Sequence, residues 1–98
     1  MLKVTKKMPR EYRFELGSQL LRSGSSIILN IAEGSGKQSE KELNRFIETA
    51  LGSSYETLAN LDILQANDLI EKKDFDTGQQ IIVDVCRQLG AFKKKLDL

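Results

Sequence analysis

The stretch from Ser39 to Leu69 restricts the fold of this chain most, because about thirty residues follow one another without a proline. Small and apolar residues recur in it at spacings of three and four, which places them on one face of an α-helix. These residues are Leu43, Phe46, Ile47, Ala50, Leu51, Ser54, Leu58, Leu61 and Leu64. Ser39 and Glu42 have the spacing of a capping box at the start of the pattern. The pattern predicts a helix over about 40–69, roughly 45 Å long.

A second helix is predicted before this one, over about 14–33. Leu16, Leu20, Ile27 and Ile31 follow one another at spacings of four, seven and four, which is the pattern of one helical face. The isoleucines of this segment also fit a strand, but the length of the apolar pattern favours a helix. Gly34 is then predicted to end the helix in the left-handed conformation that glycine adopts without strain.

Two further lines of residues run along this predicted helix. One line mixes small and apolar side chains, namely Gly17, Leu21, Gly24 and Ile28. The other line is a polar stripe of Arg22, Ser26, Asn30 and Glu33. The polar stripe has two interpretations, a recognition surface or a hydrogen-bonded polar layer within a bundle or at a subunit contact. We favour the structural interpretation, because polar residues at a packed seam fix register and oligomeric state.

The turn over residues 34–38 is expected to fold the two helices back against each other. An antiparallel pairing about that turn sets residue 24 near residue 49 and residue 21 near residue 52. The segment Ser23-Gly24-Ser25-Ser26 is therefore predicted to lie against the segment Ala50-Leu51-Gly52-Ser53, with small residues facing small residues and a close approach of the two helices.

A third long helix is predicted over about 75–97. Its apolar residues step by three and four in the a/d pattern of near-parallel helix packing, and they are Phe75, Gly78, Ile82, Val85, Leu89, Phe92 and Leu96. Asp74 or Asp76 is expected to cap it. Residues 1–8 are interpreted as the remnant of a first helix that stops at Pro9. Together the segments predict one all-α domain over residues 1–98.

Composition excludes several classes of function. The chain has no histidine, which excludes imidazole acid–base chemistry and imidazole metal ligation. Its one cysteine, Cys86, lies beside the a/d pattern and is interpreted as a packed thiol. The segment 33–39 resembles a phosphate-binding loop, but Gln38 follows Lys37 where Ser or Thr is required. We therefore predict no catalytic residue, no metal and no cofactor. Without a signal peptide or a membrane helix, the expected location is the cytoplasm.

Basic residues are expected to gather at the two ends of the molecule. The antiparallel layout brings six of them to one end, namely Lys6, Lys7, Arg10, Arg13, Lys72 and Lys73. These six are the candidate phosphate contacts for a nucleic acid. Lys37, Lys41 and Lys93–Lys95 gather at the other end, where the last three also complement a helix dipole. The net charge of +1 is small for a nucleic-acid-binding protein.

Specific residues of the second predicted helix resemble a known family. They are Gln19-Leu20-Leu21-Arg22-Ser23-Gly24, Ser26-Ile27 and Asn30-Ile31-Ala32-Glu33-Gly34, with further matches at Ser39, Ala50-Leu51, Glu56-Thr57 and Leu61. The chain thus resembles the bacterial four-helix-bundle family that is also named for proteins encoded within intervening sequences of 23S ribosomal RNA genes. The similarity covers about residues 9–70. It departs from many relatives at Ile28 and Asn60.

The resemblance implies an up-down-up-down four-helix bundle, in which the first helix of this chain is short or truncated. It also implies a homo-oligomer, because characterised relatives are homopentamers, and a distant branch binds nucleic acid. We therefore predict a non-enzymatic homo-oligomeric binding protein whose partner is structured RNA or a ribonucleoprotein. The alternative is a scaffold or accessory subunit that binds protein without touching nucleic acid.

Overall fold

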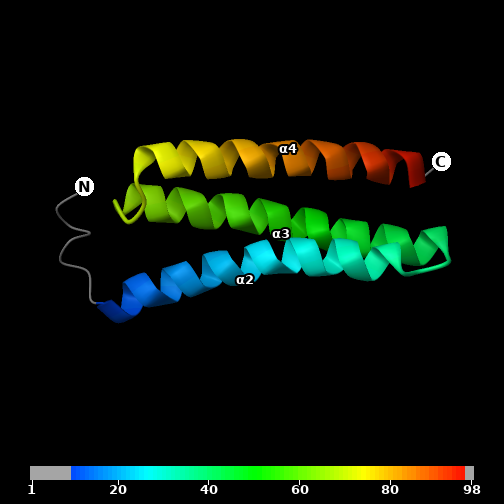
Figure 1. Cartoon of the computed structure of the whole chain (residues 1–98), viewed down its shortest axis with the longest axis horizontal. Coiled ribbons are helices and arrows are strands. Elements are labelled where there is room, and N and C mark those ends of the chain that lie inside the picture. The colour runs from blue at the N-terminus through cyan, green and yellow to red at the C-terminus, as the bar shows by residue number, and fades with distance from the viewer. Residues whose placement is uncertain (1–9, 97–98) are drawn as a thin grey trace.

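The computed structural model describes residues 10–96, which form three long helices. These are α2 (Arg10–Ser35), α3 (Glu40–Ala66) and α4 (Lys72–Leu96). Each helix runs antiparallel to the one before it, and α3 lies between the other two in Figure 1. Both α2 and α4 pack on α3 along their length. The molecule is long and thin, with extents of 50 × 22 × 15 Å.

The predicted four-helix bundle is wrong, because the described residues contain three helices. The predicted remnant of a first helix, residues 1–8, lies outside the described residues.

The observed helix bounds differ from the predicted ones by at most four residues. The helix predicted over 14–33 occupies Arg10–Ser35, and the helix predicted over 75–97 occupies Lys72–Leu96. The middle helix ends at Ala66 rather than at residue 69, because Asp68 has a left-handed φ of 56°. Its predicted start is confirmed, since the Ser39 hydroxyl accepts a hydrogen bond from the Glu42 amide at 3.2 Å.

The start of α4 differs from the prediction that an aspartate caps it. The helix begins at Lys72, and the backbone amide of Phe75 donates to the carbonyl of Glu71 at 2.9 Å. Asp74 therefore lies within the first turn, and Asp76 accepts a hydrogen bond from Lys72 Nζ at 2.9 Å. Both carboxylates still lie where they favour the positive end of the helix dipole.

The main core lies where the second half of α2 meets the first half of α3 and the end of α4. Ile47, Ala50 and Leu89 are buried there, and five half-buried side chains pack around them, namely Ile31, Leu43, Leu51, Val85 and Leu96. Towards the other end, Leu61, Leu64 and Phe75 are also buried. Phe92 departs from the predicted seam, because 46% of its surface is exposed.

Gly34 has a different structural role from the predicted one. It lies inside α2, and among residues 10–96 no glycine has a positive φ, so it does not end the helix in a left-handed conformation. Instead it is buried against α3, where a Cβ atom would lie 2.9 Å from Phe46 Cβ and 3.1 Å from Leu43 Cδ1. Glycine is needed at this position because the two helices approach too closely for any side chain.

The predicted pairing of the segment 23–26 with the segment 50–53 holds for Ser26 and Ser53, but Gly24 does not pack on Gly52. A Cβ atom on either glycine would meet nothing within 4 Å. The helices pair about six residues further along than expected, since Ser26 faces Ser53 with 2.7 Å between their hydroxyl oxygens. The close approach of Gly34 to Phe46 has the same register.

Candidate functional site

A polar ladder joins α2 to α3 along the middle of their interface. It consists of Ser23, Ser26, Ser53, Thr57 and Asn60, and all but Ser26 are buried. The Thr57 hydroxyl donates to Ser23 Oγ at 2.9 Å, and Asn60 Nδ2 donates to the same oxygen at 3.2 Å. Ser26 and Ser53 share the 2.7 Å hydrogen bond described above. These bonds replace the hydration that the polar groups lose on burial.

The predicted polar stripe divides between this ladder and the surface. Ser26 belongs to the ladder, and Asn30 supports it by donating to the Ser26 carbonyl at 2.8 Å. Arg22 and Glu33 are exposed instead, and the Glu33 carboxylate lies 3.6 Å from Lys37 Nζ. Sequence reasoning missed Thr57 and Asn60 as members. Ser53, Thr57 and Asn60 follow one another at steps of four and three, which is a polar counterpart of an a/d pattern and could have identified them.

The polar ladder is suited to fixing a structure rather than to catalysis. Its hydroxyl and amide groups do not titrate near neutral pH. The Ser23 hydroxyl donates to the Leu20 carbonyl at 3.2 Å. The single Thr57 hydroxyl proton is shared between Ser23 Oγ and the Ser53 carbonyl oxygen, which lies 2.8 Å from Thr57 Oγ1. A hydroxyl held in two such bonds is not available as an activated nucleophile, which needs an adjacent base.

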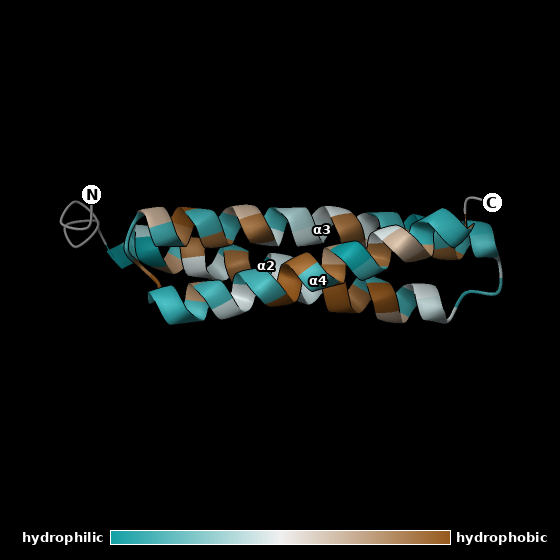
Figure 2. Cartoon of the chain, turned by 90° about the horizontal axis from the view of Figure 1, so that it is seen from above, coloured by the Kyte–Doolittle hydropathy of each residue, from teal (hydrophilic) through white to brown (hydrophobic). Residues whose placement is uncertain are grey.

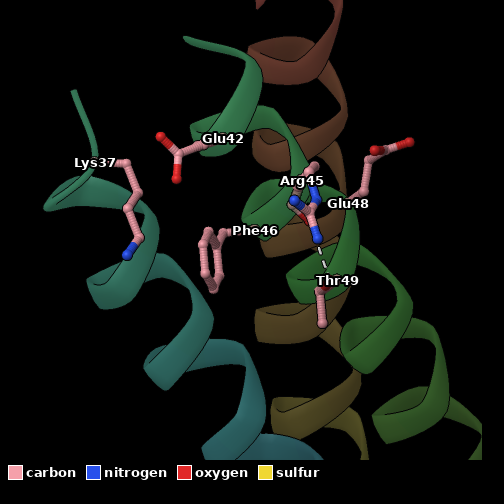
Figure 3. Close-up of a pocket in the computed structure, with 6 residues that line it drawn as sticks. All are labelled: Lys37, Glu42, Arg45, Phe46, Glu48 and Thr49. Carbon is pink, nitrogen blue, oxygen red and sulfur yellow. Dashed lines mark hydrogen bonds between the residues drawn. The ribbon is translucent and has the colours of Figure 1, made fainter. Parts of the chain in front are cut away.

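A hollow of about 550 Å³ lies beside the turn between α2 and α3 (Figure 3). Lys37 comes from the turn, and the other lining residues, Glu42, Arg45, Phe46, Glu48 and Thr49, come from the first turns of α3. Lys37 Nζ lies 5.4 Å from the centre of the Phe46 ring, which is a cation–π contact. The two cations are interspersed with two carboxylates, so the hollow has no strong preference for an anion or a cation.

A second hollow is an apolar groove of about 500 Å³ between α2 and α4, with α3 as its floor. Its walls are formed by Gly17, Leu20, Leu21, Gly24, Ser25 and Ile28 of α2 and by Gly78, Ile81 and Ile82 of α4, and its floor by Thr57 and Leu61. Figure 2 shows hydrophobic segments of α2 and α4 around the middle of the molecule. No charged residue lines this groove, so it is suited to an apolar partner.

Three large apolar side chains that line the groove are exposed. Leu21 is 72% exposed, Ile28 is 69% exposed and Ile81 is 55% exposed. Gly24 lies between Leu21 and Ile28, and its Cβ position is open. The line of Gly17, Leu21, Gly24 and Ile28 that was visible in the sequence is therefore one wall of the groove.

The basic candidate residues lie at one end of the molecule, but acidic residues accompany them. Arg10 and Arg13 begin α2, and Lys72 and Lys73 begin α4, at the same end in Figure 1. Lys6 and Lys7 lie outside the described residues. The ammonium group of Lys72 is bound to the Asp76 carboxylate at 2.9 Å. At the opposite end, Lys93 Nζ lies 3.7 Å from a carboxylate oxygen of Glu48 on α3.

Cys86 lies half-buried on α4 and faces α3. Burial raises the pKa of its thiol, and a hydrogen bond with Ser54 partly opposes that rise. A raised pKa keeps the thiol protonated near neutral pH, which makes it a poor nucleophile. Within residues 10–96 there is no cluster of three or more side chains of the kinds that hold metals.

Along residues 10–96, no helix has the length and apolarity needed to cross a membrane.

Comparison with known proteins identifies the family. No curated protein and no solved structure matches the chain. One family model does, with the description 23S rRNA-intervening sequence protein, and the match covers residues 1–91. The chain therefore belongs to the family of 23S rRNA-intervening sequence proteins, as its Asn30-Ile31-Ala32-Glu33-Gly34 segment indicates.

Proposed function

We propose that this protein is a non-enzymatic binding protein that works as a homo-oligomer and uses the apolar groove as its protein-binding surface. The observation that carries the proposal is the exposure of Leu21, Ile28 and Ile81 around one charge-free groove. Apolar residues gathered in one patch on a soluble protein mark an interaction surface more often than singly exposed ones do. Oligomers of this family were also an expectation from the resemblance.

The groove offers enough apolar surface to drive association. Burying one Leu or Ile side chain is worth about 1.5–3 kcal/mol, so the three exposed side chains offer several kcal/mol. The shape of the groove suits a helix, because α2 and α4 form two walls and α3 forms the floor. An amphipathic helix that lies in such a groove presents apolar residues at spacings of three and four.

The test is the mass of the intact chain in solution, measured by sedimentation equilibrium. We expect a mass above the 11.0 kDa of one chain, and a shift to 11.0 kDa in a Leu21→Lys/Ile28→Lys variant. Leu29→Lys is the matched control, because Leu29 is an equally exposed residue of α2 that does not line the groove. A wild-type chain that is monomeric over the whole concentration range would refute the proposal.

Binding of structured RNA is a second candidate function, favoured by the position of Arg10, Arg13, Lys72 and Lys73 at one end of the molecule. Four phosphate contacts would make the affinity fall on the order of 100-fold between 50 and 200 mM salt. An Arg10→Ala/Arg13→Ala variant should lose affinity and show a shallower salt dependence. Absence of binding to structured RNA at 50 mM salt would leave protein binding as the only candidate.

A further inference from the structure

A polar hollow of about 190 Å³ lies over the polar ladder between α2 and α3. Its lining residues are Gln19, Arg22, Ser23 and Ser26 of α2 and Glu56 of α3. None of these residues lines the apolar groove, so the hollow is a separate site. Since a water molecule in the liquid occupies about 30 Å³, the hollow has room for about six waters or for one small organic molecule.

The two charged residues of this hollow have opposite signs and come from different helices. Arg22 belongs to α2 and Glu56 to α3. Each directly precedes one partner of the hydrogen bond between Ser23 and Thr57, so the two charges lie at the same level of the interface. Both side chains are exposed, and no ion pair among residues 10–96 includes either of them. A guanidinium and a carboxylate therefore line one hollow without pairing with each other.

Neither charge has a neighbour of opposite sign on its own helix. A helical side chain meets the residues three and four positions away. Around both Arg22 and Glu56, these positions hold only serine, glycine, alanine, asparagine and glutamine. Each charge is therefore available to a ligand. A guanidinium donates two parallel hydrogen bonds to a carboxylate, and a carboxylate accepts hydrogen bonds from an ammonium group.

The Ser26 hydroxyl, which also lines the hollow, has one hydrogen-bonding position left for a ligand. A hydroxyl group has one donor and two acceptor positions. Ser26 Oγ accepts from Asn30 Nδ2 at 3.1 Å and shares a 2.7 Å hydrogen bond with Ser53 Oγ. Whichever hydroxyl donates in that bond, Ser26 keeps either its proton or one lone pair. The carboxylate of a ligand can use the proton, and the ammonium group of a ligand can use the lone pair.

The polar ladder sets the geometry of the hollow before any ligand binds. Ser23 is 4% exposed, and its hydroxyl oxygen is hydrogen-bonded to Thr57 and Asn60. These bonds fix the position of α2 along α3, so they also fix the separation of the two backbones that bear the charges. A site whose shape is set in advance loses less conformational entropy when it binds.

We propose that this hollow binds a small α-amino acid as its zwitterion, with the carboxylate on Arg22 and the ammonium group on Glu56. The ligand class follows from the charges, because a cation and an anion from two helices favour a molecule that carries both charges over a molecule that carries one. The volume of about 190 Å³ restricts the ligand to a small side chain. The site goes beyond the proposed function, because it lies outside the protein-binding groove and does not require an oligomer.

Titration of the full chain with glycine, acetate and methylammonium tests the need for both charges. Binding is followed by the NMR shifts of the backbone amides of the five lining residues. Glycine should bind at least about tenfold more tightly than acetate or methylammonium, because only glycine makes both charge-assisted contacts. Glycine that binds no more tightly than the two singly charged probes, or that shifts none of these amides, would overturn the proposal.

Two neutral variants, Arg22→Gln and Glu56→Gln, test the two charges separately. Both side chains are exposed, so the helical circular dichroism should not change. Each variant should weaken the binding of glycine at least about tenfold. Arg13→Gln and Asp62→Asn are the matched controls, because they remove exposed charges of the same two helices outside the hollow. Equal losses in the controls would show that the binding depends on net charge and would overturn the proposal.

A charge exchange, Arg22→Glu/Glu56→Arg, separates ligand binding from a structural effect of the single changes. It places the same two charges on opposite helices, so glycine should bind again in the reversed orientation, within about tenfold of the wild type. A folded exchange variant that does not bind glycine would overturn the assigned contacts. If glycine does not bind the wild type and Arg22→Gln instead lowers the sedimentation mass, the hollow belongs to a contact between copies. The amino-acid site is then refuted, and association of the chain, as the proposed function requires, stands.

Discussion

The two helix–helix interfaces of this molecule differ in chemistry although they share α3. Between α2 and α3, side-chain hydrogen bonds cross the interface, from Thr57 and Asn60 to Ser23 and between Ser26 and Ser53. Between α3 and α4, apolar contacts dominate, with Phe75 and Leu89 of α4 buried. The same central helix thus presents a polar face to one neighbour and a largely apolar face to the other.

This difference indicates that the two interfaces have different structural roles. Apolar side chains tolerate sliding, because the contacts that they lose are replaced by similar ones. Hydrogen-bonded side chains at a packed seam tolerate only the register in which donors meet acceptors. The polar interface therefore fixes how α2 lies along α3, and the apolar interface supplies burial. Fixing α2 also sets the level of Leu21 and Ile28 relative to Ile81 across the groove.

The largest effect is expected at the apolar interface, from Leu89→Ala. Leu89 belongs to the core cluster with Ile47 and Ala50, so its truncation leaves a cavity among three helices. We expect the free energy of unfolding to fall by about 2–5 kcal/mol, measured by urea denaturation. Val83→Ala is the matched control, because Val83 is an exposed residue of the same helix. Equal losses in the two variants would show that burial at this interface contributes little.

A smaller loss is expected at the polar interface, from Asn60→Ala. Asn60 Nδ2 donates to Ser23 Oγ at 3.2 Å and to the Gln19 carbonyl at 3.3 Å. Removing both bonds should lower the free energy of unfolding by about 1–3 kcal/mol in the same urea assay. Asn67→Ala is the control, because the Asn67 amide bonds within its own helix, to Ile63 at 2.8 Å, at the surface. If Asn60→Ala costs no more than Asn67→Ala, the ladder does not stabilise the pairing.

Much of the fold could be predicted from local patterns. The spacing of Leu43, Ile47, Ala50 and Leu61 identified α3, and Ser39 identified its start, because helix periodicity and capping depend on neighbours in sequence. The number of helices could not be predicted in this way. It came from the family resemblance, which implied a four-helix bundle, whereas the described chain contains three helices.

The register and the site were harder to predict, because they depend on contacts between distant residues. The sequence predicts Gly34 as a helix end, but it lies within α2 and is buried against Phe46 of α3. The stripe of Arg22, Ser26, Asn30 and Glu33 was taken as one unit, yet it faces two environments because α2 turns its edge to solvent. The periodicity of a sequence identifies which residues share one face of a helix, but it does not identify the element that packs on that face.

A double-mutant cycle on Ser26 and Ser53 isolates one hydrogen bond of the polar interface. Each single change to Ala should lower the free energy of unfolding by about 0.5–1.5 kcal/mol, because it strands the other hydroxyl. The double variant should lose less than the sum of the two, since no hydroxyl is then left without its partner. Ser35→Ala is the control, because the Ser35 hydroxyl bonds to Ile31 at 2.8 Å within α2. Strict additivity would contradict a direct bond across the interface.

The smallest effect concerns Cys86, a half-buried thiol of α4 that faces Ser54 of α3. Burial raises the pKa of its thiol above the ordinary value of 9.0, so the native state binds the thiol proton more tightly than the unfolded state does. The stabilisation that this provides is complete below pH 9.0 and decreases as the pH rises through the native pKa. Each pH unit is about a tenfold step in proton activity. Between about pH 8 and pH 10, the urea midpoint of the wild type should therefore fall more than the urea midpoint of Cys86→Ala. Cys86→Ala is itself the control, because it differs from the wild type only at residue 86. Equal falls would show that the thiol is as free to ionise in the folded chain as in the unfolded one, and that α4 does not bury it against Ser54.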